Sequence, residues 1–328
     1  MIVLNMFFLR WRKLCGPVAC DSPHSGAFLK KPTIPTSGDT LSGFCFAFSA
    51  YFLWGFLPVY MKMLAHFPSA EIVAHRVIWS VPIAGILLIL MGRTKDIRAA
   101  ILNPKTLAMG CLTASLITTN WGVYVWAIST DRTLDAALGY YINPLFSVGL
   151  GAIFLRESIT RSQIAAIALA AAAVVFLAVS NGSVPWVSIG LTVTWGFYAL
   201  CKKQLPIGPN QGFLLEVLIL FVPALTYVGW LTSQGQNHFD LSMTYNTWLL
   251  LGCGLITAVP LLLYANGAKG LQLTSIAIMQ YIAPTLIFLV AVFVFDEEFG
   301  QARMIAFPMI WLALVIYSVS MFRNMRSV

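Results

Sequence analysis

Charged residues are scarce in this sequence. Asp, Glu, Lys and Arg make up 10% of its 328 residues, whereas soluble domains carry roughly a quarter. Hydrophobic residues make up 59%, and the mean hydropathy is +0.82. The apolar residues come in runs of about 20 rather than alternating with polar ones, which disfavours a β-barrel. The composition therefore predicts an all-α membrane protein.

Motifs of disulfide-linked, metal-binding and enzymatic proteins are also absent from the sequence. The six cysteines are scattered, without a CxxC pair or a metal-ligand spacing. The chain holds no GxSxG, HExxH, Walker A or dinucleotide-binding glycine motif. We therefore expect no disulfide framework, no metal, no cofactor and no enzymatic activity. Without a Walker A loop, transport would draw on an ion gradient, on exchange or on the solute's own gradient.

Ten apolar segments follow one another from Leu41 onward. Each is close to the ~20 residues that cross about 30 Å of hydrocarbon. Residues 1–40 differ, because they are rich in Pro, Ser, Gly and Lys, and we expect them to form a disordered N-terminal extension. The ten segments lie at about 41–64, 70–91, 106–129, 134–155, 162–179, 184–201, 212–231, 246–268, 274–295 and 303–322.

The basic residues indicate how these segments are oriented. If the N-terminus is inside, 16 of the 20 Lys and Arg residues fall on inner tails and loops. Only Lys62, Arg132 and Arg303 fall outside, and Arg76 lies within the second segment. The positive-inside rule then predicts that both termini are cytoplasmic. This bias accounts for the net charge of +8, so we expect no nucleic-acid partner.

The chain also repeats itself. The stretch "YINPLFSVGLGAIFLRES", which starts at Tyr141, aligns with "YIAPTLIFLVAVFVFDEE", which starts at Tyr281, at an offset of 140 residues, and Glu157 falls on Glu297. "WGFLPVYMK" aligns with "WGFYALCKK" at an offset of 141 residues. Chance similarity between apolar helices is the alternative. Ten segments in two halves, 41–180 and 181–328, give five per half, so the second half crosses the membrane upside down. Inverted repeats of this kind are typical of secondary transporters.

The second apolar segment contains three ionisable residues. Glu71 falls in the first turn of the expected helix, where the helix dipole favours a carboxylate. His75 lies about 40° from Glu71 on the same face, one turn deeper. Arg76 could snorkel to the outer interface or face a water-filled path. In the second case His75 could titrate and Arg76 could hold an anionic group.

A second acidic residue, Glu216, lies about one turn into the seventh segment. The repeat places it opposite His75 or Arg76, depending on which offset is used. A buried carboxylate can carry a proton, so we predict that Glu216 couples transport to protons, with Glu71 as a further candidate. The alternative is an ion pair between Glu216 and a basic helix residue or a loop lysine.

Two prolines at equivalent positions, Pro144 and Pro284, indicate a binding site. Proline removes a helix hydrogen bond, and paired interruptions in the two halves point to the site in transporters with repeats. Polar and aromatic residues accompany them on the same and neighbouring segments. Any one of these aromatics could equally serve ordinary packing or an interfacial belt. The residues predicted to bind substrate are His75, Arg76, Asn120, Trp121, Tyr124, Tyr141, Asn143, Tyr264, Gln280 and Tyr281.

Several motifs resemble those of a known family. "AYFLWGFLPVYMKML", "EIVAHRVIWS", "NWGVYVWAI", "LGYYINPL", "FLRE" and "QYIAPTLIFL" are similar to motifs of the RarD group, in the EamA branch of the drug/metabolite transporter superfamily. The resemblance covers about Leu41 to Phe322. It implies ten transmembrane helices as two inverted five-helix EamA repeats in a bacterial inner membrane. It also implies a permease for small metabolites or amphipathic drugs such as chloramphenicol.

Two further functions remain open on sequence grounds. An uncoupled facilitator would move the same small-molecule substrates without an ion gradient. A membrane-embedded binding or assembly protein would retain a ligand or partner within the lipid bilayer without flux. The small residues "AAIALAAAAVV", at 165–175, permit close helix packing, either inside the bundle or in a homodimer.

Overall fold

The computed structural model describes residues 40–326, with gaps at 91, 93, 156–158, 240–243, 268–270 and 272. The residues it describes form helices joined by loops, without a strand among them. The predicted extension at 1–40 lies outside these residues, except for Thr40, and so does the repeat residue Glu157.

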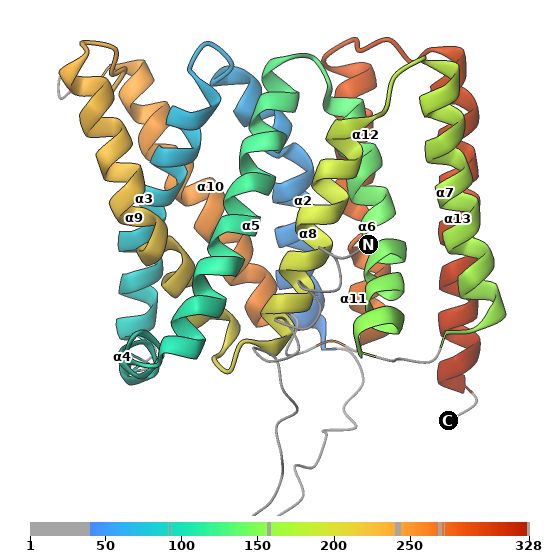
Figure 1. Cartoon of the computed structure of the whole chain (residues 1–328), viewed down its shortest axis with the longest axis horizontal. Coiled ribbons are helices and arrows are strands. Elements are labelled where there is room, and N and C mark those ends of the chain that lie inside the picture. Colours follow the sequence, from blue (N-terminus) through green and yellow to red (C-terminus); the bar gives the residue numbers. More distant parts are fainter. Residues whose placement is uncertain are drawn as a thin grey trace, which may run out of the picture. The chain divides into compact units, whose positions relative to one another are not determined.

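The helices overlap all of the predicted apolar segments. Seven of those described, α2, α3, α6, α7, α9, α10 and α13, are long and apolar enough to cross a membrane, which confirms an all-α membrane fold. The helices, in chain order, are α2 Leu41–Met63, α3 Ser69–Leu90, α4 Thr94–Leu102, α5 Pro104–Ser129, α6 Thr133–Leu155, α7 Arg161–Ser180, α8 Trp186–Gln204, α9 Pro209–Ser233, α10 Tyr245–Gly267, α11 Leu273–Met279, α12 Ile282–Phe293 and α13 Gln301–Arg326 (Figure 1).

Local sequence signals explain where several helices begin. The hydroxyl of Thr40 accepts a hydrogen bond from the Gly43 backbone at 3.1 Å and caps α2. Pro104 opens α5, where its missing N–H costs nothing. A reciprocal capping box between Thr160 and Gln163 starts α7. These contacts satisfy backbone groups that a helix leaves unpaired at its N-terminus.

Ion pairs identify one end of the bundle. Lys62, near the end of α2, pairs with Asp131, just after α5. Asp135, at the start of α6, pairs with Arg303, at the start of α13, over 3.1 Å. This end is called the upper end, as it is drawn in Figure 1, and the opposite one the lower end. Helices α2, α5, α7, α9 and α12 run towards the upper end, and α3, α6, α8, α10 and α13 run away from it (Figure 1).

The paired interruption predicted at Pro144 and Pro284 occurs in one half only. The second half breaks between α11 and α12 at Gln280 and Tyr281, and Gln280 is the residue whose carbonyl Pro284 leaves without its usual helical partner. The first half does not break, because α6 continues through Pro144. A single missing hydrogen bond is absorbed there within one continuous helix, so the prediction of a break at Pro144 is wrong.

Part of the small-residue stretch of α7 packs inside the bundle, while other alanines of the stretch are exposed. Ala166, Ala170 and Ala173 are buried in an apolar cluster with residues of α6 and α13, including Phe307. This is the first of the two packing possibilities that the sequence left open for this stretch. A homodimer therefore stays a prediction without support from these alanines.

A glycine brings α10 against α3. A Cβ at Gly254 would lie 2.4 Å from the carbonyl oxygen of Trp79, so only glycine permits this separation of the two helices. Thr257 lies three residues after Gly254, and Arg76 lies three residues before Trp79. Residues three apart share a helix face, so Arg76 and Thr257 lie on the facing sides of the two helices, one turn to either side of this contact, and the long Arg76 side chain spans the distance between them.

Candidate functional site

Arg76 lies inside the bundle. It stands seven residues after the first residue of α3, and its side chain is 3% exposed. Its Nε donates a hydrogen bond to Thr257 Oγ1 on α10 at 3.0 Å. Its guanidinium lies 4.6 Å from the centre of the Trp121 ring on α5, which is cation–π geometry. The guanidinium therefore points between α10 and α5 instead of snorkelling towards the helix end.

The charge of Arg76 is not balanced by any carboxylate in the part of the chain that the structure describes. The ion pairs found there involve other groups. The Nη1 atom of Arg76 and the hydroxyl of Tyr124 are both buried without a hydrogen-bond partner. Tyr124 lies within electrostatic reach of Arg76. The site thus holds two uncommitted polar groups next to a buried positive charge.

Aromatic side chains surround this charge. Trp121 and Tyr124 lie three residues apart on one face of α5. Tyr140 of α6 packs against Tyr124, with ring centres 5.7 Å apart. The hydroxyl of Tyr140 also donates to the side-chain oxygen of Asn120 at 3.3 Å. Asn120 in turn donates to the Leu191 carbonyl of α8 at 3.1 Å, so it fixes α5 to α6 and α8.

Glu71 and His75 meet the loop between α9 and α10 at the upper end. Glu71 is fully buried, and its carboxylate accepts from the His238 backbone at 3.0 Å and contacts His238 Nδ1 at 2.7 Å. The ring of Phe239 stacks on His75, with centres 5.4 Å apart. Trp79 donates from Nε1 to His75 Nδ1 at 3.1 Å. Glu71 therefore holds this loop down over the face that carries His75.

Glu216 is engaged in an ion pair at the lower end. It is 1% exposed, and its Oε1 lies 2.6 Å from Lys202 Nζ. Tyr198 donates a hydrogen bond to Oε2 at 3.2 Å. Lys202 and Tyr198 both belong to α8, which precedes α9. The ion pair with a helix lysine, which the sequence left open as an alternative, is thus present.

Tyr141 and Tyr281 lie apart from Arg76, and both line a second cavity. The Tyr141 hydroxyl bonds to Thr285 Oγ1 of α12 at 2.9 Å. Tyr141, Tyr281 and Thr285 line a cavity of ≈ 390 Å³ together with Trp311 of α13. The Tyr281 hydroxyl is buried. The two repeat-related tyrosines therefore converge on one cavity between α6, α12 and α13.

The other predicted residues are more scattered. Tyr264 of α10 packs against Tyr51 and Trp54 of α2, with ring centres 5.8 Å away in each case. Asn143 is 6% exposed, and its side-chain oxygen has no partner. Gln280 is half-buried at the break before α12. Tyr264 thus belongs to a separate aromatic cluster with α2.

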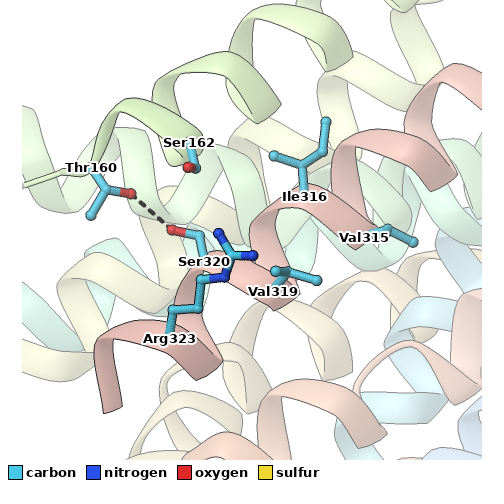
Figure 2. A pocket seen from close by; sticks show the side chains of 7 residues that line it. All are labelled: Thr160, Ser162, Val315, Ile316, Val319, Ser320 and Arg323. Atoms are coloured by element: carbon cyan, nitrogen blue, oxygen red, sulfur yellow. Dashed lines mark hydrogen bonds between the residues drawn. The ribbon is translucent and has the colours of Figure 1, made fainter. Parts of the chain in front are cut away.

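A further cavity lies at the lower end between α7 and α13. Figure 2 shows Thr160 and Ser320 facing one another beside it, with their hydroxyls 2.9 Å apart. The cavity has a volume of ≈ 320 Å³, and Arg323 is the charged residue of its lining. None of the predicted site residues lines it, so we do not take it as the functional site.

Glu297 has a structural role that its place in the repeat does not reveal. It is buried, and its two oxygens accept hydrogen bonds from the backbone N–H groups of Thr133 and Leu134 at 2.7 and 2.9 Å. A carboxylate at a helix N-terminus is favoured by the helix dipole and by these unpaired donors. Glu297 therefore fastens the loop after α12 to the start of α6.

Sequence reasoning missed several residues of these clusters. Tyr140 was passed over in favour of its neighbour Tyr141, although adjacent helix residues point about 100° apart. Thr257 carries no sequence signal, because its contact with Arg76 joins residues 181 positions apart. A signal for Lys202 was available, because it lies on the helix just before the one that carries Glu216, separated from it by a short loop.

Comparison with known proteins identifies relatives over most of the chain. Residues 41–179 match the model of the EamA-like transporter family. Protein RarD of Streptomyces exfoliatus is 36% identical over 285 residues, which is 87% of this chain and 90% of that protein. An uncharacterized transporter of Vibrio cholerae is 39% identical over 289 residues, 87% of this chain and 94% of that protein.

Two further comparisons bear on name and fold. The chloramphenicol-sensitive protein RarD of Pseudomonas aeruginosa is 31% identical over 279 residues, 84% of this chain and 92% of that protein. A solved crystal structure is similar with a TM-score of 0.52 and 16% identity, covering 84% of this chain and 96% of that one. At that identity the likeness concerns the fold alone.

Proposed function

The chain belongs to the EamA-like transporter family, and we propose that it is a proton-linked secondary transporter that moves small metabolites or amphipathic drugs across the inner membrane. Its relatives are named as transporters, which agrees with the absence of enzyme motifs from the sequence. The observation that carries the proposal is the buried Arg76, a positive charge without a described carboxylate partner, enclosed by aromatic rings.

The mechanism that we propose uses two inverted repeats of five helices each. Helices α2 and α8 would begin the two halves, and they run in opposite directions (Figure 1). Contacts between helices come in matching pairs: α2 with α10 and α8 with α5, or α3 with α10 and α9 with α5. The family match at 41–179 supports a first repeat over 41–180, and we propose that the second covers 181–328. Alternating access by such repeats is the general scheme of secondary transporters.

Basic residues favour a cytoplasmic lower end. Lys and Arg gather in the positive-inside pattern on the cytoplasmic side of membrane proteins. The upper end carries Lys62, Arg132 and Arg303. The lower end carries Arg98, Lys105, Arg161, Lys202, Lys203 and Arg323. Both termini would then be cytoplasmic.

Glu216 is the group that we propose takes up the coupled proton, with Glu71 as the second candidate. The carboxylate of Glu216 is held by Lys202 and Tyr198. Protonation would neutralise the carboxylate and release Lys202, so a proton could change how α8 packs against α9. A change of that kind links proton uptake to movement of one helix against another.

Counterflow in proteoliposomes tests the proposed function. Vesicles would be loaded with amino acids, aromatic metabolites or chloramphenicol, with and without a pH gradient. We expect counterflow of at least one solute, enhanced by the gradient. Equal counterflow with and without the pH gradient would instead favour an uncoupled facilitator. If the protein is shown to be folded and none of the solutes shows counterflow, a binding or assembly protein would be favoured.

A further inference from the structure

We infer that the Arg76 site binds the carboxylate of a small monocarboxylate with an aromatic or other apolar body. The inference rests on the proposed transport function and specifies its substrate class. It follows from the charge of the site, from its uncommitted donors and from the character of its walls.

The charge of Arg76 requires an anion. Burying a cation without a counterion is costly, and buried charges in proteins are normally paired. The acidic residues nearest along the fold are already engaged, since both oxygens of Glu71 hold His238 and both oxygens of Glu216 hold Lys202 and Tyr198. Three other described cations, Lys62, Lys202 and Arg303, do have carboxylate partners. An anionic ligand would give Arg76 the partner that the described chain does not provide.

The donors of the site fit a carboxylate. Guanidinium matches the planar geometry of a carboxylate better than any other side chain. Thr257 occupies Nε and fixes the plane of the group, while Nη1 stays uncommitted. The buried hydroxyl of Tyr124 is a second donor without a partner. One guanidinium balances one negative charge, which favours a monocarboxylate over a dianion.

The walls of the site specify the rest of the ligand. Trp121 covers one face of the guanidinium, and Tyr124 and Tyr140 continue the aromatic surface. Such rings stack on planar apolar groups and offer no further charge. A cationic ligand would be repelled by Arg76. The site therefore selects a carboxylate that carries an aromatic or apolar body.

Benzoate and its neutral isostere benzamide provide the test. Their binding to the full-length protein in lipid nanodiscs would be measured by calorimetry. We expect benzoate to bind at least about tenfold more tightly than benzamide, because hydrogen bonds between charged groups are stronger than those to a neutral amide. Arg76→Gln should abolish this preference. Arg132→Gln is the matched control, since exposed Arg132 also lies over a tryptophan of α5, 5.3 Å from the Trp126 ring centre.

Tyr124→Phe keeps the test decisive if Arg76→Gln does not fold. The phenylalanine preserves the ring and removes only a hydroxyl that has no partner among the described residues, so folding should be unaffected. Benzoate binding should weaken several-fold, and more than benzamide binding does, because a charged acceptor makes the stronger hydrogen bond.

Four results would overturn the inference. Three of them are equal affinity for benzoate and benzamide, a preference that survives both Arg76→Gln and Tyr124→Phe, and no benzoate binding by folded protein. Chloride that competes with benzoate at equal concentration would show an inorganic-anion site, which also overturns it. The counterflow assay distinguishes failure of this inference from failure of the proposed function. If only neutral or cationic solutes are transported, the protein is a transporter but its substrate is not a monocarboxylate.

Discussion

Arg76 and Glu216 each lie seven residues after the first residue of their helix, α3 and α9, yet their surroundings differ. Since α3 starts at the upper end and α9 at the lower end, each charge lies about 10 Å in from opposite ends of the bundle. Glu216 has a lysine at 2.6 Å and a tyrosine hydroxyl at 3.2 Å. Arg76 has a threonine hydroxyl and the face of a tryptophan.

This difference indicates that the two halves of an inverted repeat can have different functions, one in coupling and the other in ligand binding. A charge that is paired within the protein holds two helices together until a proton or another ion disrupts the pair. A charge left unpaired is available to a ligand. We therefore assign coupling to the Glu216 side and binding to the Arg76 side, and the following variants test that division.

Lys202→Met is expected to have the largest effect. It leaves the carboxylate of Glu216 buried without its cation, and removal of one partner from a buried ion pair costs about 3–5 kcal/mol. Thermal unfolding of the purified protein should show a markedly lower midpoint. The double variant Lys202→Met with Glu216→Gln should recover most of the loss, and Arg76→Met should show no comparable loss. Equal midpoints for the single and double variants would mean that the loss does not come from leaving the carboxylate of Glu216 without its cation.

Gly254→Ala should disturb the Arg76 side instead. The new methyl group would lie 2.4 Å from the Trp79 carbonyl oxygen, so α10 must move away from α3. Overpacking of this kind costs typically about 1–3 kcal/mol, and it would separate Thr257 from Arg76. We expect a lower unfolding midpoint and weaker benzoate binding. Gly149→Ala in α6 is the control, because its methyl group would meet no atom within 4 Å; if both variants behave alike, close α3–α10 packing does not position the site.

Sequence and structure agree best where the signal is local. Long apolar runs predict where the helices lie. The first turn of a helix is predicted by residues within that turn, such as the proline that opens α5 or the threonine that caps α7. Pro144 shows the limit of such reasoning, because α6 tolerates the missing hydrogen bond while the segment with Pro284 breaks. The effect of a proline depends on neighbouring helices, which a local pattern does not contain.

The charged residues of the candidate site could be predicted from the sequence, but the residues that they contact could not. Arg76 could be predicted because an ionisable group within an apolar segment is unusual, and Trp121 and Tyr124 because they belong to a set of polar and aromatic residues on repeat-related segments. Which of them meet depends on helix rotation and on long-range contacts such as Arg76 with Thr257. For the same reason the predicted set divides between the Arg76 cluster, the Tyr141 cavity and the Tyr264 cluster.

Glu216→Gln tests the coupling side. A glutamine cannot take up and release the proton, so the variant should still show counterflow but lose accumulation driven by a pH gradient. One pH unit corresponds to about 1.4 kcal/mol, so the wild-type protein should accumulate its substrate about tenfold per unit for one coupled proton. Glu71→Gln is the parallel variant. If that variant loses accumulation and Glu216→Gln keeps it, the coupling group lies at the upper end.

Thr257→Val should give the smallest effect, and it distinguishes a binding site from ordinary packing. The Thr257 hydroxyl donates to the Cys253 carbonyl at 2.8 Å and accepts from Arg76, and valine preserves its shape while removing both bonds. We expect benzoate binding to weaken by about 1–2 kcal/mol, because the guanidinium loses the contact that fixes its plane.

Thr285→Val is the matched control for that variant. Its hydroxyl also donates four residues back, to the Tyr281 carbonyl at 2.7 Å, and also bonds a side chain of another helix, Tyr141. Both valine variants should lower the unfolding midpoint to a similar extent, whereas only Thr257→Val should weaken benzoate binding. Equal weakening by the two would mean that the ligand responds to bundle stability in general, and the division between a binding side at Arg76 and a coupling side at Glu216 would lose its support.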